Sequence, residues 1–184
     1  MDNKELLTLA AKAAGMVTYN SDTGKMHWLE KPLCQKDAVR WNRRYAGKEC
    51  GTIDDKGYRR ILFRLDGCKT FKIRTHRLAW YFYYGVLPKG EIDHINQDKL
   101  DNRISNLRDV PKSLNLRNAK MQRNNTSGVT GVVKHKQSGK WCAQANINGK
   151  HIHIGSFIEK SDAEDAVLSF RQEHSFTELH GFKK

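Results

Sequence analysis

The chain has 184 residues, room for one large or two small domains, and its 33 lysines and arginines outnumber its 20 aspartates and glutamates. The net charge of +13 favours a polyanionic partner, whereas no apolar stretch is long enough to span a bilayer and the N-terminus does not resemble a signal peptide. The cysteines form no C-x-x-C pair, which argues against a structural zinc site and for reduced thiols in a cytosolic protein: Cys34, Cys50, Cys68 and Cys142.

The first residues predict a helix and a β-hairpin. Residues 3–14 combine good helix formers with a periodic apolar face, and Gly15 ends the pattern. Two short strands, 17–19 and 25–29, flank the turn-rich loop 20–24. We therefore expect a short amphipathic helix followed by a hairpin.

A second hairpin is predicted from strands 58–65 and 70–74, joined through residues 66–68. In its first strand, Arg60, Leu62 and Arg64 alternate with Ile61, Phe63 and Leu65. Because successive side chains of a strand point to opposite faces, one face is expected to be basic and the other apolar. The basic face is a candidate to lie along DNA, although a solvated face is the commoner outcome.

Residues 76–84 are dense in aromatic side chains and predict a helix. Such a helix either stacks on bases or packs against the preceding sheet, and packing is the favoured role. The aromatic positions are Trp80, Tyr81, Phe82, Tyr83 and Tyr84.

The most informative segment contains Asp93-His94-Ile95-Asn96, then Asn102-Arg103 and Asn106-Leu107. Cleavage of a phosphodiester needs a divalent cation held by oxygen ligands and a base that activates water. Asp93 suits the cation and its neighbour His94 suits the base. Asn115, twenty-two residues beyond Asp93, offers a second oxygen ligand. The pattern predicts a metal-dependent nuclease.

The stretch from 91 to 118 closely resembles the phage and intron-encoded branch of the HNH endonucleases. The resemblance implies a two-stranded hairpin followed by a helix around one divalent metal. It implies that His94 is the general base and that Asp93 and Asn115 are the metal ligands. It also implies that Asn106 is the central asparagine, which braces the loop and orients the histidine. Many HNH enzymes end the motif with histidine, and the asparagine here makes Mg²⁺ or Mn²⁺ the expected ion rather than zinc.

Residues on both sides of the motif extend this interpretation. The segment 76–80, followed by Gly85 and Pro88, is similar to the lead-in of the same family, and His76 is then either a core histidine or a residue behind the site. Four polar residues are candidates for phosphate contacts, with ordinary solvated charge as an equal alternative: Arg103, Arg108, Arg117 and Asn118.

Positive charge is concentrated beyond the motif. Residues 110–158 contain no acidic residue, the footprint expected of a nucleic-acid-binding segment, and include Lys112, Arg117, Lys120, Arg123, Lys134, Lys136, Lys140 and Lys150. A polar linker is predicted at 121–127. Three strands at 129–135, 141–147 and 151–157 follow, and then a helix at 161–173 in which Ser161 and Glu164 form a capping box.

The C-terminal pattern is similar to the Apetala-2/ethylene-responsive-factor DNA-binding domain. The similarity rests on Gly131-Val132, Gly139-Lys140-Trp141, Ala143, Gly155-Ser156-Phe157, residues 162–166 and His180-Gly181. It implies a three-stranded sheet that enters the major groove. The candidate DNA-facing residues are Lys134, His135, Trp141, Gln144, Asn146, His151 and His153. Since Asn and Gln favour adenine, a GC-rich target is not expected. Trp141 has the alternative role of packing between sheet and helix.

Together these patterns predict an α+β protein with antiparallel hairpins and a helix at 1–75, a ββα-metal HNH core at 76–120, a linker at 121–127, and a three-stranded antiparallel sheet on one helix at 128–184. The expected activity is site-directed cleavage of double-stranded DNA by a monomer or weak dimer, with one Mg²⁺ or Mn²⁺ per site, no small-molecule cofactor and no membrane partner. The expected location is the cytoplasm of a phage-infected bacterium. Two alternatives stay open: a DNA-binding regulator with an inactive nuclease core, and an RNA-binding nuclease.

Overall fold

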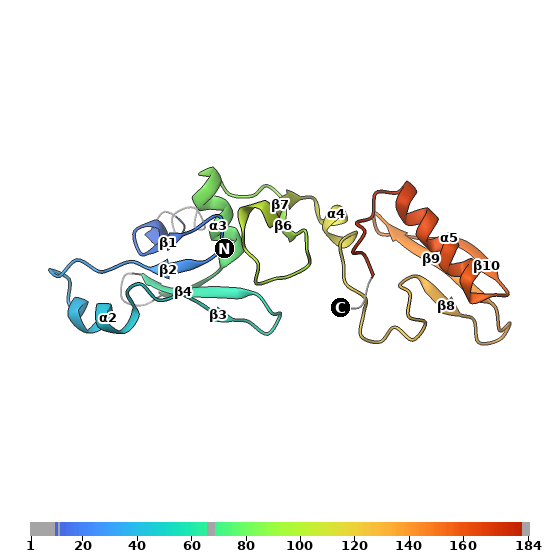
Figure 1. The fold of residues 1–184 in the computed structure, drawn as a ribbon, viewed down its shortest axis with the longest axis horizontal. Coiled ribbons are helices and arrows are strands. Elements are labelled where there is room, and N and C mark those ends of the chain that lie inside the picture. The colour runs from blue at the N-terminus through green and yellow to red at the C-terminus, as the bar shows by residue number, and fades with distance from the viewer. Residues whose placement is uncertain (1–9, 11, 66–68, 182–184) are drawn as a thin grey trace. The chain divides into compact units, whose positions relative to one another are not determined.

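The computed structural model describes residues 10, 12–65 and 69–181 and divides the chain into two compact units, Met1–Asp109 and Val110–Lys184 (Figure 1). Both units mix helices with antiparallel strand pairs, so the predicted α+β class is confirmed. Among the described residues, no helix is both long and apolar enough to cross a membrane.

The N-terminal unit contains both predicted hairpins. β1 (Val17–Tyr19) pairs with β2 (Met26–Trp28), and a three-stranded sheet has the order β3 (Thr52–Ile53), β4 (Arg59–Leu65), β5 (Lys69–Arg74). The other elements are α2 (Ala38–Tyr45), α3 (Thr75–Tyr84), β6 (Glu91–His94), the 3-10 helix η1 (Ile104–Asn106) and β7 (Leu107–Val110), which pairs with β6. The sequence patterns do not anticipate α2 or β3. Of the helix expected at 3–14, the structure describes residues 10 and 12–14, which are helical.

Alternation along β4 separates a core face from an outer face. Ile61 and Phe63 are 0% and 2% exposed, whereas Leu62 between them is 44% exposed. Ile61 pairs with Ile73 of β5, which is also buried. A fully buried side chain of this size contributes about 1.5–3 kcal/mol to stability. The predicted alternation is confirmed at these positions, while the side chains of residues 64 and 65 and the turn at 66–68 lie outside the described part.

Helix α3 packs against β4 and β5, as the sequence favours. Its Leu78 and Ala79 are buried, and Trp80, Tyr81 and Phe82 pack around the same core. Tyr83 and Tyr84 stay exposed at the end of the helix. One apolar cluster thus runs through the whole unit, with buried members that include Val17, Met26, Cys50, Phe63, Leu78, Ile92 and Leu107.

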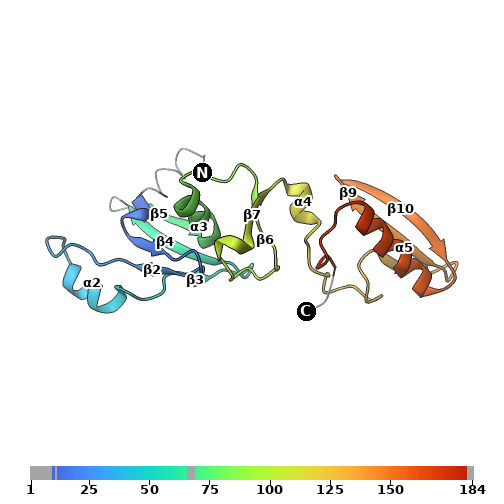
Figure 2. The same ribbon diagram turned by 45° about the horizontal axis from the view of Figure 1, so that its top comes forward.

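The C-terminal unit is a sheet covered by a helix on one face (Figure 2). After α4 (Lys112–Leu116) come β8 (Val132–Lys134), β9 (Trp141–Ile147), β10 (Lys150–Phe157) and α5 (Lys160–Glu173), and the strand order is β10-β9-β8. Asn148 and Gly149 both have positive φ, as the two-residue hairpin turn requires. The predicted three strands and helix are confirmed, and the boundary between units places α4 with the C-terminal unit.

The predicted capping box of α5 is wrong. The helix begins at Lys160 with Glu159 as its N-cap, so Ser161 lies inside the first turn, where its hydroxyl bonds to the side chain of Asp162 at 3.4 Å. Lys160 instead forms an ion pair with Glu164 at 2.9 Å, one turn along the helix. The Glu164 carboxylate is therefore paired with Lys160, whereas a capping box would have it accept from the backbone N–H of Ser161.

Candidate active site

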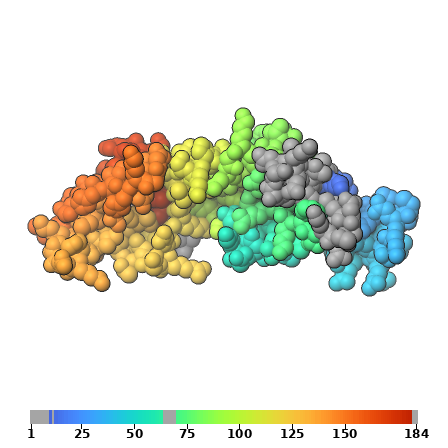
Figure 3. All heavy atoms as spheres, turned by 180° about the vertical axis from the view of Figure 1, so that it is seen from behind, coloured from blue at the N-terminus to red at the C-terminus, as the bar shows by residue number. Residues whose placement is uncertain are grey.

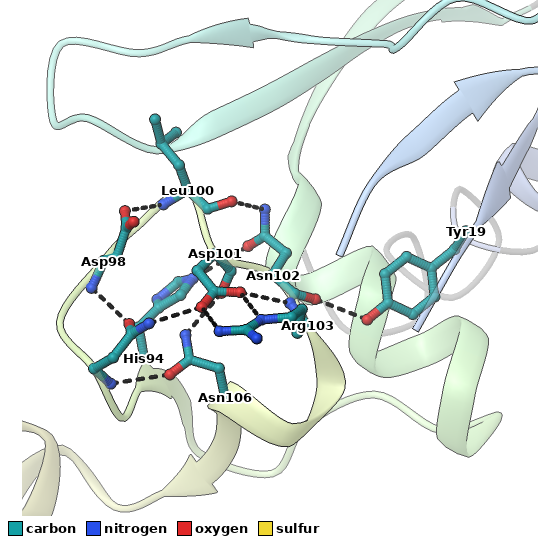
Figure 4. A network of polar contacts seen from close by, with 9 residues as sticks. Tyr19, His94, Asp98, Leu100, Asp101, Asn102, Arg103 and Asn106 are labelled. Atoms are coloured by element: carbon teal, nitrogen blue, oxygen red, sulfur yellow. Dashed lines mark hydrogen bonds and ion pairs between the residues drawn. The ribbon is translucent and has the colours of Figure 1, made fainter. Parts of the chain in front are cut away.

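The candidate site lies at the end of β6, and Figure 4 shows His94 among the residues of the loop that follows this strand. Asp93 and His94 are 6% and 4% exposed. The chain turns sharply after His94, with Gln97 at a positive φ, and returns through η1 to β7. This is the hairpin that the sequence predicts, and α4 follows it in the chain. Two adjacent polar side chains are therefore held in a largely buried position.

Asn106 shapes the loop between these strands. Its Oδ1 accepts a hydrogen bond from the Asn96 backbone N–H at 2.9 Å, and its Nδ2 donates to the carbonyl of Asp101 at 2.8 Å. The Ile95 N–H also donates to the Asn106 carbonyl at 2.9 Å. The side chain of Asn106 therefore braces the loop, while a different asparagine meets the imidazole of His94.

That asparagine is Asn102, whose Oδ1 lies 3.1 Å from Nε2 of His94. The imidazole is also flanked by rings: His76 meets it edge to face with centroids 5.2 Å apart, and Tyr58 lies 5.9 Å away. Burial lowers the pKa of His94, although the hydrogen bond with Asn102 opposes the shift. A neutral imidazole at neutral pH is the form that can accept a proton.

His76 is a buried histidine that also touches the candidate base. It is 5% exposed and lies against both Tyr58 and His94. It is therefore both a core histidine and a residue behind the site, the two alternatives that the sequence raised. Burial lowers the pKa of His76 to about 3, with the nearby His94 and Arg74 adding to the effect. His76 therefore stays uncharged beside His94 at neutral pH.

Asp93 carries the carboxylate expected to bind a metal. Its Oδ2 accepts hydrogen bonds from Nε and Nη2 of Arg108 at 2.9 and 2.7 Å. Arg108, a candidate phosphate contact, is thus partly committed to Asp93. In the described part of the chain, no group of three or more His, Cys, Asp or Glu side chains is placed to hold a metal ion. The carboxylate of Asp93 and the amide oxygen expected from Asn115 are donors that fit a hard cation such as Mg²⁺.

The other candidates near the motif have structural partners. Arg103 forms a two-point ion pair with Asp101 at 2.8 and 2.6 Å, which lowers the pKa of Asp101 to about 2. Asn115 lies on α4, in the C-terminal unit. Arg117 donates to the carbonyl of His174 at 2.9 Å, and Asn118 is 4% exposed. Burial of Asn118 argues against a phosphate contact by that residue. The hydrogen bond to His174 argues against a phosphate contact by Arg117.

The hairpin of β1 and β2 forms hydrogen bonds with the loop that carries Asn102 and supports it. The Tyr19 hydroxyl donates to the Asn102 carbonyl at 2.7 Å, and the Ile104 N–H donates to the Ser21 carbonyl at 3.1 Å. Burial raises the pKa of Tyr19 to about 12, so its hydroxyl keeps the proton it donates. A Cβ at Gly24 would run into the backbone of Asn102 and the residue after it. Sequence patterns give no signal for this role of Tyr19 and Gly24.

We expect Gly24→Ala to destabilise the N-terminal unit more than Gly47→Ala does. Both glycines have φ +71, so both alanines incur the left-handed penalty of about 1–2 kcal/mol. Only at Gly24 does the new methyl meet backbone, which adds about 1–3 kcal/mol. Urea unfolding followed by tryptophan fluorescence measures both variants, and equal losses of stability would show that the hairpin does not press on the loop.

In the C-terminal unit, a strip of polar side chains lines the sheet on the side away from α5. Cross-strand pairs join His151 to Asn146 and His153 to Gln144, and Nε2 of His151 lies 3.0 Å from Oε1 of Gln144. Nε2 of His153 lies 3.3 Å from the Ser156 hydroxyl. The structure therefore brings four of the predicted DNA-facing residues together on one surface.

The remaining three candidates lie elsewhere on this unit. Trp141 packs partly against the core, as its alternative role predicts, with Nζ of Lys134 5.5 Å from the ring centroid. His135 is exposed in the β8–β9 connection, where its Nδ1 lies 3.1 Å from the Ser138 hydroxyl. Figure 3 shows this connection, in yellow-orange, at the surface of its unit.

An open groove of about 1370 Å³ runs beside the polar strip. Gln144, Asn146 and His151 line it together with the predicted linker. The linker forms turns that are closed by hydrogen bonds. The Ser127 hydroxyl donates to the carbonyl of Val129 at 2.8 Å, and Nδ2 of Asn125 donates to the same carbonyl at 3.1 Å. The linker is thus part of the C-terminal unit's surface.

Comparison with known proteins adds to this geometry. A family model described as HNH endonuclease matches residues 74–117, the span from the end of β5 through β6, β7 and α4. The chain is 35% identical over 84 residues to Protein 3.8 of Escherichia phage T7, a match that covers 45% of this chain and 69% of that protein. A solved structure described as "DNA binding and cleavage by the HNH homing endonuclease I-HmuI" matches at 24% identity with a TM-score of 0.40, covering 56% of this chain and about half, 51%, of that one. Since the matched span holds the buried Asp93–His94 pair and its asparagine-braced loop, the chain belongs to the HNH endonuclease family.

Proposed function

We propose that the protein is a metal-dependent endonuclease that hydrolyses phosphodiester bonds in double-stranded DNA. The observation that carries this proposal is the buried imidazole of His94, whose pKa is lowered by its burial, beside the carboxylate of Asp93 and inside the span that matches the HNH family. The net charge of +13 suits DNA as the partner, because DNA is a polyanion that basic side chains bind through its phosphates.

In the proposed mechanism, His94 takes the proton from the attacking water. Its lowered pKa leaves it neutral before the reaction, and the Asn102 hydrogen bond and neighbouring rings hold it in place. Asp93 and Asn115 would hold one Mg²⁺ or Mn²⁺ through oxygen atoms. That ion, when bound, would supply positive charge to stabilise the phosphate and the leaving oxygen. Asn106 keeps the loop closed around the histidine.

We further propose that residues 76–120 carry the cleavage chemistry and that residues 128–184 form an Apetala-2-type module that reads the duplex. Support comes from the sheet-on-helix architecture and from the polar strip of Gln144, Asn146, His151 and His153. This strip contains amide and imidazole groups that can meet base edges. The place of action would be the cytoplasm of a phage-infected bacterium, with site-directed, homing-like cutting.

Incubation with supercoiled plasmid and Mg²⁺ tests the proposal against its alternatives. Conversion to relaxed or linear DNA supports the nuclease. Retardation of the plasmid without any cutting would instead identify a DNA-binding regulator. Cleavage of a structured RNA, with the plasmid left intact, would move the activity to RNA.

We expect cleavage to require Mg²⁺ or Mn²⁺ and to disappear in chelator, because the proposed ligands are oxygens, which hard cations prefer. Asp93→Ala and Asn115→Ala should each shift the activity to higher Mg²⁺. Asp55→Ala, which alters an exposed aspartate in the β3–β4 turn, is the control and should leave the titration unchanged. An unaltered titration in both site variants would remove the two residues from the metal site, and full activity in chelator would rule out the mechanism.

A further inference from the structure

The side chain of Asn102 is buried, at 2% exposure, and is bonded at both ends. Its Nδ2 donates to Oγ1 of Thr75 at 3.1 Å and to the Leu100 carbonyl at 3.3 Å. Its Oδ1 faces Nε2 of His94 at 3.1 Å. A continuous line of hydrogen bonds therefore leads from the start of α3 to the candidate base.

The donor and the acceptor of every hydrogen bond in this series can be assigned from the backbone carbonyl at its far end. Oγ1 of Thr75 donates its hydrogen to the carbonyl of Arg59 at 3.1 Å, and a carbonyl can only accept. The hydroxyl therefore meets Asn102 with a lone pair, so the amide NH₂ must point toward Thr75. The Leu100 carbonyl requires the same orientation. The amide oxygen then faces His94, and Nε2 must carry the hydrogen.

We propose that Thr75 and Asn102 are positioning residues that hold neutral His94 as the Nε2–H tautomer, so that the lone pair that accepts the proton lies on Nδ1. In a neutral imidazole one nitrogen donates and the other accepts, so fixing the first fixes the second. The edge-to-face contact with His76 holds the plane of the ring as well. Use of this lone pair in catalysis rests on the proposed function, whereas the tautomer itself does not.

The tautomer is measured directly by NMR of the full-length protein labelled with ¹⁵N-histidine, at about pH 8, well above the ordinary histidine pKa of about 6.5. The signals of His94 are identified by their absence from His94→Gln. We expect a protonated Nε2 and an unprotonated Nδ1, distinguished by their couplings to the two ring carbon-bound hydrogens. A protonated Nδ1 in the wild-type protein would overturn the proposal, whatever the protein cleaves.

A matched pair of variants tests the line of bonds. Thr75→Val keeps the shape of the side chain but removes the hydroxyl, so the Asn102 amide loses one of its two acceptors and can turn over. Thr75→Ser keeps the hydroxyl. We expect the valine variant to show a mixture of His94 tautomers and a kcat lower by about 10-fold or more, with KM within about 2-fold. The serine variant should keep the wild-type tautomer and kcat.

A valine variant with the wild-type tautomer and kcat would contradict the role of Thr75. Equal losses in both variants would point to general damage to the fold and would also count against the proposal. If no variant, wild type included, cleaves DNA while His94 is still the Nε2–H tautomer, the proposed function fails and the positioning of His94 stands.

Discussion

His94→Ala should lower the rate of DNA cleavage by about 10²- to 10⁴-fold while DNA affinity stays near wild type. The variant removes the proposed base, and it leaves in place the lysines and arginines that we propose contact phosphate. Nicking of supercoiled plasmid gives the rate, and a gel-shift titration without Mg²⁺ gives the affinity. The imidazole is buried, so thermal unfolding of the variant must be recorded alongside.

His27→Ala is the matched control for this experiment. His27 lies on β2, pairs across the hairpin with Thr18 and takes no part in the loop that carries Asn102. We expect its rate and affinity to equal those of the wild type. Wild-type turnover in His94→Ala would remove the histidine from the chemistry, and a parallel loss of affinity would show that the residue serves binding instead.

A chain that ends at Asn125 should lose site preference and keep only weak, indiscriminate nicking. The deletion removes the whole sheet with its polar strip, and base contacts are what specify a sequence. It also removes Lys134, Lys136, Lys140 and Lys150, so the slope of log affinity against log salt should become shallower by about 0.9 for each phosphate that these lysines neutralise in the full-length protein. The measurements are cleavage mapping on a long duplex and binding over a range of salt.

The same deletion should raise the Mg²⁺ requirement. Within the C-terminal unit, Thr177 donates from its N–H and its hydroxyl to the Arg117 carbonyl, at 3.2 Å each, and the Gly181 N–H donates to the Ala119 carbonyl at 2.9 Å. These bonds anchor the residues that directly follow α4, the helix that carries Asn115. The shortened chain keeps α4 but loses its anchor, so the proposed ligand should be held less firmly.

A full-length variant with the four lysines changed to glutamine separates charge from anchorage. It should show the shallower salt slope with unchanged site preference and Mg²⁺ dependence, since phosphate contacts position a protein without specifying sequence. If the shortened chain cuts the same sites with the wild-type salt slope, specificity must lie in the N-terminal unit.

Periodicity predicts most of the strands and helices because burial follows it closely. Ile61 and Phe63 are buried and Leu62 is exposed, as a two-residue repeat requires, and the Asn148-Gly149 turn joins the strands predicted at 141–147 and 151–157. The helix α2 escapes this logic. Its Ala38, Trp41 and Tyr45 do recur at helical spacing, but the helix has only eight residues and its N-cap Asp37, in the left-handed region, makes no capping hydrogen bond with its side chain.

The candidate site is predicted only where it is local in sequence. Asp93, His94 and Asn106 belong to one motif, and the structure places them around one loop. The hydrogen bonds of Asn102 reach Thr75, 27 positions away, and Tyr19, 83 positions away. No spacing rule reports such contacts, because they depend on how three separate elements meet in the core. Arg117 and Asn118 likewise meet residues far along the chain, since Arg117 donates to the carbonyl of His174 and Asn118 accepts a hydrogen bond from the hydroxyl of Thr177.

The apolar cluster of the N-terminal unit limits how far the nuclease motif can be transplanted. Leu78, Ile92 and Leu107 of the motif region share one core with Val17, Met26 and Phe63, which lie outside it. A graft of residues 76–120 onto another scaffold would bare the first three side chains and would leave behind both Thr75 and the Tyr19 hydroxyl. We therefore expect a graft to fold only if it carries the hairpins together with the motif, with its C-terminal junction beyond β7.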